Sequence, residues 1–369
     1  MHRPQTEAEL AEIVAGSDVP LRICGGGTRG IDGPGEVVSA AGLSGVTLYE
    51  PGALTLVVQA GTPVAEIEAL LAGEGQRLAF EPLDHRGLLG SSGEPTIGGV
   101  IAGNVSGPRR VQAGAARDHA LGLRFVDGRG DVVSNGGRVM KNVTGYDLVK
   151  LMAGSFGTLG VLTEVSLKVL PATETEASLQ IAVADAGAAV AVMSAALGSP
   201  FEVSGAGHDA ATGLVSLRIE GFGDQVSYRC GALSERLAAQ GNVAVLEQEA
   251  SRALWLSYRD VAPFHGVSGD VWRVSCAPSA APGLIARAEA EGAMLDWGGG
   301  LIWLRLPEGS DLRVRLGSYD GHATLVRGRG HARFEPKPGP LAALEAGLRR
   351  QFDPKGIFNP GLMAEAEEA

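Results

Sequence analysis

The sequence predicts an α+β protein of two domains, the second of them built on an antiparallel sheet. In the first 171 residues, two glycine-rich segments, 25–30 and 90–122, interrupt short strands and helices. After Pro171, the order strand, helix, strand, strand, helix, strand occurs twice. That order is typical of a ferredoxin-like unit, so we expect two such units in the second sheet. The segment ATETEAS after Pro171 is the expected linker between the domains.

Turn and capping signals delimit the elements of the first domain. Thr6 and Glu9 fit a capping box that begins a helix ending near Gly16. Thr62 is the expected cap of a second helix, with Pro63 at its first position. The segment LGLRFVDGRGDVVS predicts a hairpin, and GYDLVKLMAG a helix. The expected strands are Leu21–Cys24, Val46–Tyr49, Leu54–Ala60 and an alternating strand from Val161 to Val169.

Apolar patterning gives the elements of the second domain. The expected strands are Leu179–Val183, Phe201–Ser204, Leu214–Glu220, Val243–Leu246, Val271–Cys276, Met294–Trp297, Ile302–Leu306 and Ala323–Val326. The expected helices are Ala188–Leu197, Gln225–Ala239, Ala253–Tyr258, Ala281–Glu291, Asp311–Leu316 and a final Leu341–Phe352. The two halves share no residue-level repeat, so the expectation concerns architecture alone.

Composition excludes several classes of protein. The net charge of −11 argues against a general nucleic-acid binder and against a polybasic membrane anchor. Cys24, Cys230 and Cys276 form no CxxC pair, so we expect no iron–sulfur cluster or structural zinc held by this chain alone. There is no apolar signal core at the start and no run of 18 apolar residues, which favours a cytoplasmic location.

The segment LRICGGGTRG places three glycines directly after a short strand. Glycine tolerates positive φ and lets backbone amides approach a ligand, and successive amides can form an anion-binding concavity. With the Thr28 hydroxyl and the Arg29 cation, this loop suits a diphosphate. A flexible turn is the alternative for these residues alone. The loop matches neither the Rossmann fingerprint nor a Walker loop.

The second segment, TIGGVIAGNVSG, predicts a short helix beginning at Thr96 whose N-terminus faces an anion. Asn104 and Ser106 offer side-chain hydrogen bonds to a polar ring or a ribose. Two such segments, separated by a strand and a helix, indicate opposite walls of one extended cofactor site.

Six motifs, taken in their order along the chain, resemble those of a known family: GGGTRG, TIGGVIAGNVSG, GAARDHALGL, VMKNVTGYDL, GSFGTLGVLTEVSLKVLP and FDPKGIFNPGLM. The chain resembles FAD-binding oxidoreductases of the vanillyl-alcohol oxidase / p-cresol methylhydroxylase type. Within that family, it is similar to the FAD-binding E subunits of bacterial glycolate oxidase (glycolate dehydrogenase). The resemblance implies a two-lobed FAD-binding domain over 1–171, a cap domain over 172–328 and a C-terminal segment, 329–369, that returns to the FAD domain.

The resemblance also implies the cofactor-binding residues. Five residues of the first loop would hold the diphosphate of FAD: Gly25, Gly26, Gly27, Thr28 and Arg29. Seven would line the flavin and ribityl side: Pro82, Thr96, Gly98, Gly99, Asn104, Gly107 and Gly114. Gly160 and Val161 would meet the adenine end, although a strand start explains them equally well, and Asn359 would lie near the isoalloxazine. No histidine lies beside GGGTRG, so we expect noncovalent FAD.

The candidate catalytic residues lie in the segment YDGHATLVRGRGHARFEPKP. Oxidation of a 2-hydroxy acid needs a base for the hydroxyl proton and a cation for the carboxylate. His322 or His331 could be the base, and Arg333, Arg327 or Arg329 the cation. A solvated basic edge is the alternative. The two histidines lack the close spacing of the metal ligands in catalytic relatives, so we predict no metal. Phe156 also replaces an acidic residue that is common in those relatives.

Three interpretations follow. The first is an FAD-carrying subunit of a glycolate oxidase complex, with a paralogous FAD-containing subunit and an iron–sulfur subunit as partners. Any membrane association would then be peripheral, through those partners. The second is a stand-alone FAD-dependent hydroxy-acid or alcohol oxidoreductase. The third is an assembly subunit that retains the FAD fold without turnover of its own.

Overall fold

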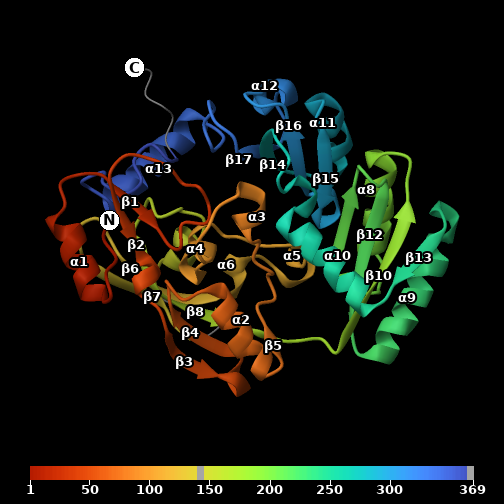
Figure 1. Cartoon of the computed structure of the whole chain (residues 1–369), viewed down its shortest axis with the longest axis horizontal. Coiled ribbons are helices and arrows are strands. Elements are labelled where there is room, and N and C mark those ends of the chain that lie inside the picture. The colour runs from red at the N-terminus through yellow and green to blue at the C-terminus, as the bar shows by residue number, and fades with distance from the viewer. Residues whose placement is uncertain (139–144, 364–369) are drawn as a thin grey trace. The chain divides into compact units, whose positions relative to one another are not determined.

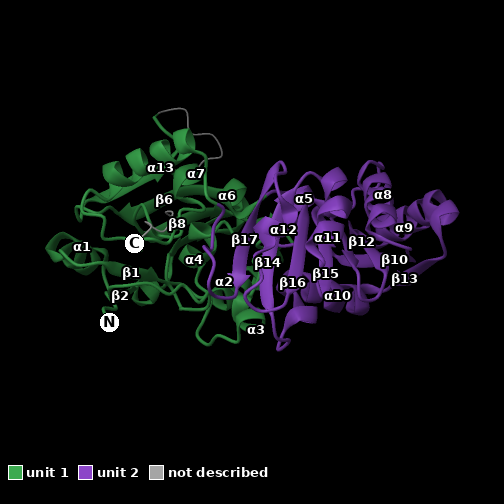
Figure 2. Cartoon of the chain, turned by 90° about the horizontal axis from the view of Figure 1, so that it is seen from above, with its two compact units in different colours: residues 1–105, 115–172, 336–369 green, residues 106–114, 173–335 purple. Residues whose placement is uncertain are grey.

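The structure, a computed structural model, describes residues 1–138 and 145–363. The first part of the VMKNVTGYDL motif, 139–144, lies outside the described residues. The chain divides into two compact units: unit 1 comprises 1–105, 115–172 and 336–369, and unit 2 comprises 106–114 and 173–335 (Figure 2). The expected boundaries fell after 171 and 328. Sequence patterning did not indicate that the short segment 106–114 leaves unit 1 to become part of unit 2.

Unit 1 has two lobes with separate apolar cores. The larger lobe contains a five-stranded antiparallel sheet with the order β3-β4-β8-β6-β7 (Figure 1). Its strands are β3 (Val46–Glu50), β4 (Thr55–Gln59), β6 (Ala120–Val126), β7 (Val132–Gly136) and β8 (Val161–Lys168). Its helices are α2 (Val64–Gly73), α3 (His85–Leu89), α4 (Ile97–Ala102), α6 (Ala116–His119) and α7 (Leu148–Met152), and β5 (Gln76–Arg77) pairs with β9 (Leu170–Pro171).

The smaller lobe joins the start of the chain to its end. Strand β1 (Leu21–Cys24) pairs in parallel with β2 (Glu36–Ser39), and Leu21 also bridges to Phe358. Leu10 and Val14 of α1 (Glu7–Gly16) pack with these residues in one apolar core. The last helix of the unit is α13 (Gly339–Phe352). The C-terminal segment therefore belongs to the same unit as the glycine loop that follows β1.

Unit 2 contains one eight-stranded antiparallel sheet with the order β13-β10-β12-β11-β15-β16-β14-β17. Each half has the strand order of a ferredoxin-like unit, and the halves join where β11 pairs with β15. This confirms the expected sheet. Its strands are β10 (Thr175–Ala182), β11 (Gly205–Asp209), β12 (Leu214–Gly221), β13 (Val243–Leu246), β14 (Asp270–Cys276), β15 (Gly292–Asp296), β16 (Leu301–Leu306) and β17 (Gly321–Arg327).

The two faces of this sheet are covered differently. An apolar core under one face includes residues of α8 (Ala186–Leu197), α9 (Gly223–Leu237), α11 (Ala281–Ala288) and α12 (Leu312–Leu316). Over the other face, α10 (Gln248–Asp260) packs Trp255 and Tyr258 against Gly205 and Gly207 of β11. The remaining helix, α5 (Arg110–Ala113), lies in the 106–114 segment.

Two expected elements differ from the structure. The strand predicted at Phe201–Ser204 lies instead at Gly205–Asp209, because Glu202 has a φ of 51° that interrupts an extended chain. The segment GAGHD has low strand propensity, and its glycines make room for the rings of α10. The second helix begins at Val64 and is not capped by Thr62, whose hydroxyl donates to the Gln59 carbonyl.

Candidate cofactor site

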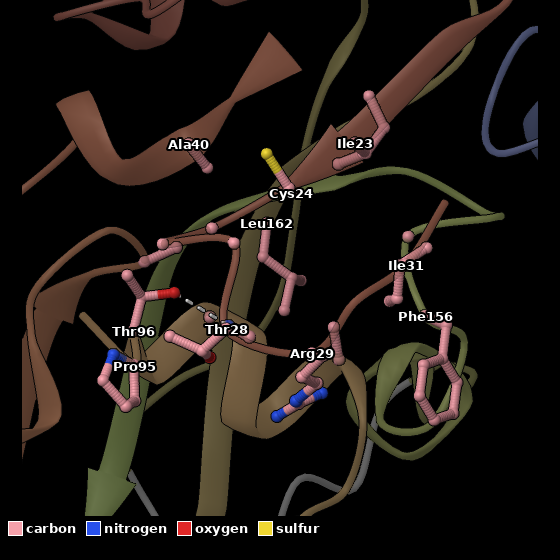
Figure 3. A pocket seen from close by; sticks show the side chains of 18 of the residues that line it. Ile23, Cys24, Thr28, Arg29, Ile31, Ala40, Pro95, Thr96, Phe156 and Leu162 are labelled. Carbon is pink, nitrogen blue, oxygen red and sulfur yellow. Dashed lines mark hydrogen bonds between the residues drawn. The ribbon is translucent and has the colours of Figure 1, made fainter. Parts of the chain in front are cut away.

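A cavity of about 380 Å³ lies within unit 1, where the loop after β1 meets α4 and the turn before β8 (Figure 3). Ten of the expected cofactor-binding residues line this cavity: Gly25, Gly26, Gly27, Thr28, Arg29, Thr96, Gly98, Gly99, Gly160 and Val161. Residues of both glycine-rich segments therefore line the same cavity.

The glycine loop presents open backbone amides. Gly27 has a φ of 76° and Gly30 a φ of 55°, which is the left-handed region that favours glycine. Within the described part of the chain, the amides of Gly26, Gly27 and Thr28 donate no hydrogen bond to another protein group. All three residues line the cavity. Such a run of amides can bind an anion such as a diphosphate.

Close packing against the segment that precedes α4 explains the first two glycines. A Cβ on Gly26 would lie 1.7 Å from the Glu94 carbonyl oxygen, and a Cβ on Gly25 would lie 2.1 Å from Thr96 Oγ1. Ser91 Oγ also donates to the Thr28 carbonyl at 2.7 Å. Gly25 and Gly26 are thus required for contact between the two walls, while Gly27 is required by its φ.

The N-terminus of α4 is not the anion site that the sequence predicts. The Ile97 amide donates to the Thr62 carbonyl, and the Gly98 amide donates to the Ala60 carbonyl. The Gly99 amide donates to Thr96 Oγ1, a bond drawn dashed in Figure 3. The first three amides of the helix are therefore occupied by the protein, whereas the amides of Gly26, Gly27 and Thr28 in the glycine loop are open.

The Arg29 guanidinium lies against the other end of α4. A Cβ on Gly103 would meet Arg29 Nη1 at 2.0 Å, so the guanidinium lies beside the carboxyl end of this helix. A cation is favourable there because the last carbonyls of a helix carry partial negative charge.

Asn359 supports the cavity wall without lining it. Its Oδ1 accepts a hydrogen bond from the Ile23 amide at 2.8 Å, and its Nδ2 donates to the Phe156 carbonyl at 2.9 Å. Ile23 and Phe156 both line the cavity. Asn359 is buried and has a φ of 42°, a conformation that asparagine tolerates well. The closing NPG motif therefore connects two walls of the site.

The other expected residues lie elsewhere. Gly107 and Gly114 belong to unit 2, and Pro82 and Asn104 are not among the cavity-lining residues. Asn104 accepts a hydrogen bond from the Arg117 amide. Residues that sequence reasoning missed include Cys24, Ala40, Leu83, His85 and Leu162, which line the cavity. Apart from their closeness to the glycine loops, these residue types carry no motif signal.

Three candidate catalytic residues lie along the last strand of unit 2 and the segment after it. His322 is exposed on β17, where it pairs with Ser275. His331 Nε2 lies 3.1 Å from the Gly309 carbonyl, and its Nδ1 lies 3.7 Å from the Asp311 carboxylate. The Arg333 carbonyl accepts from Arg313 and from the Leu325 amide.

Glu335, which follows these residues, accepts from the Ala323 amide and lies 3.4 Å from Arg313. Across 1–138 and 145–363, no group of three or more His, Cys, Asp or Glu side chains is placed to hold a metal. No helix in the same ranges is long and apolar enough to cross a membrane.

Comparison with known proteins supports a cofactor-binding role for the part of the chain that forms this cavity. A family model described as "FAD binding domain" matches residues 1–136, which include both glycine-rich walls. In its fold, the chain is similar to a solved alkyldihydroxyacetonephosphate synthase, with a TM-score of 0.73 and 16% identity over 97% of this chain and 75% of that one. The chain thus has the fold of an FAD-binding protein, and its glycine cradle lies within the part that the FAD-binding model matches.

Two curated relatives narrow the assignment. The chain is 35% identical to glycolate oxidase subunit GlcE of Escherichia coli (strain K12), over 93% of this chain and 92% of that protein. It is 40% identical to glycolate oxidase subunit GlcD of Bacillus subtilis (strain 168), over 34% of this chain and 25% of that protein. The chain belongs to the family of FAD-binding proteins that includes glycolate oxidase subunit GlcE.

Proposed function

We propose that this chain is the FAD-binding subunit of a glycolate oxidase (glycolate dehydrogenase) complex. The observation that carries the proposal is its similarity to GlcE along nearly the whole length of both proteins. The complex would oxidise glycolate or related 2-hydroxy acids to 2-oxo acids and pass the electrons to partner subunits. The partners would be a paralogous FAD-containing subunit, to which the similarity to GlcD points, and an iron–sulfur subunit.

The residues of unit 1 fit FAD. The open amides of Gly26, Gly27 and Thr28 would hold the diphosphate, and Gly160 and Val161 would contact the rest of the dinucleotide along the cavity wall. When bound, FAD supplies the hydride acceptor for oxidation of the hydroxyl carbon. We propose that it binds without a covalent bond, by packing and hydrogen bonds alone.

The chain itself would have to supply a base and a cation. His322 or His331 remains the proposed base, with Arg333 as one proposed cation near the carboxylate. His331 Nδ1 lies 3.7 Å from the Asp311 carboxylate. We expect the protein to lie in the cytoplasm, where any membrane association would be peripheral and made through partner subunits.

The test compares the chain alone with the chain purified together with its partner subunits. Each preparation is made anaerobic, mixed with glycolate or D-lactate, and followed by its flavin absorbance. Bleaching only in the presence of partners supports the complex, and bleaching of the isolated chain supports a stand-alone enzyme. An assembly subunit without turnover would leave its own flavin oxidised while the complex remains active. No bleaching in either preparation would contradict the hydroxy-acid assignment.

A further inference from the structure

Two arginines of unit 2 share one indole ring. The Arg110 guanidinium carbon lies 4.4 Å from the centroid of the Trp297 ring, and that of Arg273 lies 5.0 Å from it. Arg110 comes from the 106–114 segment, Arg273 from the middle of β14, and Trp297 from the turn directly after β15. Three separate parts of the unit thus meet at this ring.

Arg273 lies on the face of the sheet opposite the large helical core. Its neighbours along β14, Trp272 and Val274, belong to that core, and alternate residues of a strand face opposite sides. Arg273 is only partly buried. Within 1–138 and 145–363, its guanidinium makes no hydrogen bond and no ion pair. Its cation–π contact in these ranges is with the Trp297 ring.

Arg273 carries a positive charge beside this ring. Burial is the main cause that lowers the pKa of Arg273 to about 10, and the Arg110 cation lowers it further, while the Asp296 carboxylate acts in the opposite direction. Arg273 is still a cation at neutral pH. The Asp296 carboxylate accepts a hydrogen bond from the Trp297 amide at 2.7 Å. A bound anion would be favourable beside Arg273, whose guanidinium has no hydrogen bond or ion pair within the described residues.

Trp297 is held in an unfavourable conformation. Its φ is 53°, which is rare for a bulky side chain and costs of the order of 1–3 kcal/mol. The Asp296 carboxylate fixes its amide, and its Nε1 donates to the Gly107 carbonyl at 3.0 Å. Strain of this kind concentrates at functional sites. Hydrogen bonds from its backbone amide and from its indole Nε1 hold Trp297 in place, and its ring contacts the two guanidinium groups.

We infer that Arg273, with Arg110 beside it on the Trp297 ring, binds the carboxylate of the 2-hydroxy acid substrate. This inference rests on the proposed function. Arginine is suited to the task because its planar fork holds both oxygens of a carboxylate. Arg273 would then supply the cation that sequence reasoning sought at Arg333, and Arg110 would assist through its charge.

The test measures anion binding and turnover separately on the FAD-loaded chain. Titration calorimetry gives the dissociation constant for oxalate, a small dicarboxylate that is not a hydroxy acid, and for inorganic phosphate. Steady-state assays with partners present give KM and kcat for glycolate. The variants are Arg273→Gln, Arg273→Lys and Arg110→Gln. The matched control is Arg236→Gln, which removes one exposed cation from α9 of the same unit.

We expect Arg273→Gln to weaken oxalate binding and to raise the KM for glycolate, each by at least about tenfold. Arg273→Lys should have an intermediate effect, because lysine keeps the charge and loses the fork. Arg236→Gln should match the wild type. If Arg273→Gln does not fold, Arg273→Lys and Arg110→Gln still decide the question. Phosphate should bind more weakly than oxalate.

The outcomes separate this inference from the proposed function. One outcome is that the Arg273 and Arg110 variants turn over glycolate with an unchanged KM and an unchanged dissociation constant for oxalate. That result would overturn the inference and leave the proposed function intact. Oxalate binding that depends on Arg273, without flavin bleaching by any hydroxy acid, would overturn the function and retain a carboxylate site. Wild-type protein that binds neither oxalate nor glycolate, or that binds phosphate in preference to both, would overturn the inference.

Discussion

Arg109 and Glu220 form a bidentate ion pair in which both nitrogen–oxygen distances are 2.9 Å. The two side chains are only 7% and 3% exposed, respectively. Arg218 stands 3.6 Å from the same carboxylate. The pair attaches the 106–114 segment to strand β12 inside unit 2. Removing one partner should therefore be more harmful than removing both, because the partner left behind stays buried and loses its bidentate counter-charge.

We expect Arg109→Met to lower the free energy of unfolding by about 3–5 kcal/mol. Glu220→Gln in the same chain should recover part of that loss, because the double variant no longer buries a carboxylate that has lost its bidentate partner. Urea unfolding of the wild type, the two single variants and the double variant gives the coupling. Additive effects of the two changes would contradict a direct interaction between these side chains.

Gly26 and Gly27 should respond differently to alanine. Gly26→Ala places a Cβ 1.7 Å from a backbone oxygen, so the loop has to move and FAD retention should fall sharply. The Cβ of Gly27→Ala would have no atom within 4 Å, but the positive φ at this position costs alanine about 1–2 kcal/mol. Gly33→Ala, with open space and no such φ, is the control. The ratio of flavin absorbance to protein absorbance after purification is the measurement, and equal ratios for all three variants would contradict this account.

Asn359→Ala should destabilise the cavity wall, although Asn359 does not itself line the cavity. It removes hydrogen bonds to Ile23 and Phe156 and leaves alanine at a positive φ, so we expect a loss of about 1–3 kcal/mol in unfolding free energy. FAD affinity should fall with it. Asn242→Ala, at an exposed asparagine, should change neither quantity. Titration of the apoprotein with FAD gives the affinity, and an unchanged constant in Asn359→Ala would show that this side chain does not position the cavity wall.

FAD should leave the protein when the chain is denatured. Neither Cys24 nor His85, which line the cavity, is expected to bond to the flavin, and burial raises the pKa of the Cys24 thiol so that the unreactive thiol form predominates. Acid precipitation should therefore leave the yellow colour in the supernatant. Colour that stays with the pellet, and that moves to the supernatant in Cys24→Ser or His85→Gln, would establish a covalent bond.

Glu7 should contribute to stability in a pH-dependent way. Burial alone would raise the pKa of Glu7, but hydrogen bonds from Arg124 and Thr163 and the Arg124 charge lower it below its ordinary value of 4.5. A depressed pKa means that the contribution is present above pH 4.5 and is lost as the pH falls through the folded-state value. The free energy of unfolding of the wild type should exceed that of Glu7→Gln by about 1 kcal/mol at pH 7, and this difference should shrink in acid. A difference that is independent of pH would contradict this role.

The sequence predicted the sheet of unit 2 well because apolar residues recur with clear periods there. Strand β11 escaped prediction, since its glycines are selected by rings on α10 that are distant in sequence. The glycine loops were found because an amide cradle leaves a local pattern. The role of Asn359 in bridging Ile23 and Phe156, and the meeting of Arg110, Arg273 and Trp297, depend on contacts across the fold. No spacing along the chain encodes such contacts.

The chain passes between the two units at 105/106, 114/115, 172/173 and 335/336, and this path constrains how the protein is made. Arg109 leaves the ribosome long before Glu220, its buried partner. Leu21 is likewise synthesised long before Phe358, with which it pairs. The flavin cavity is therefore completed only after Asn359 has been synthesised, and neither unit can be cut out as one contiguous piece without breaking the other.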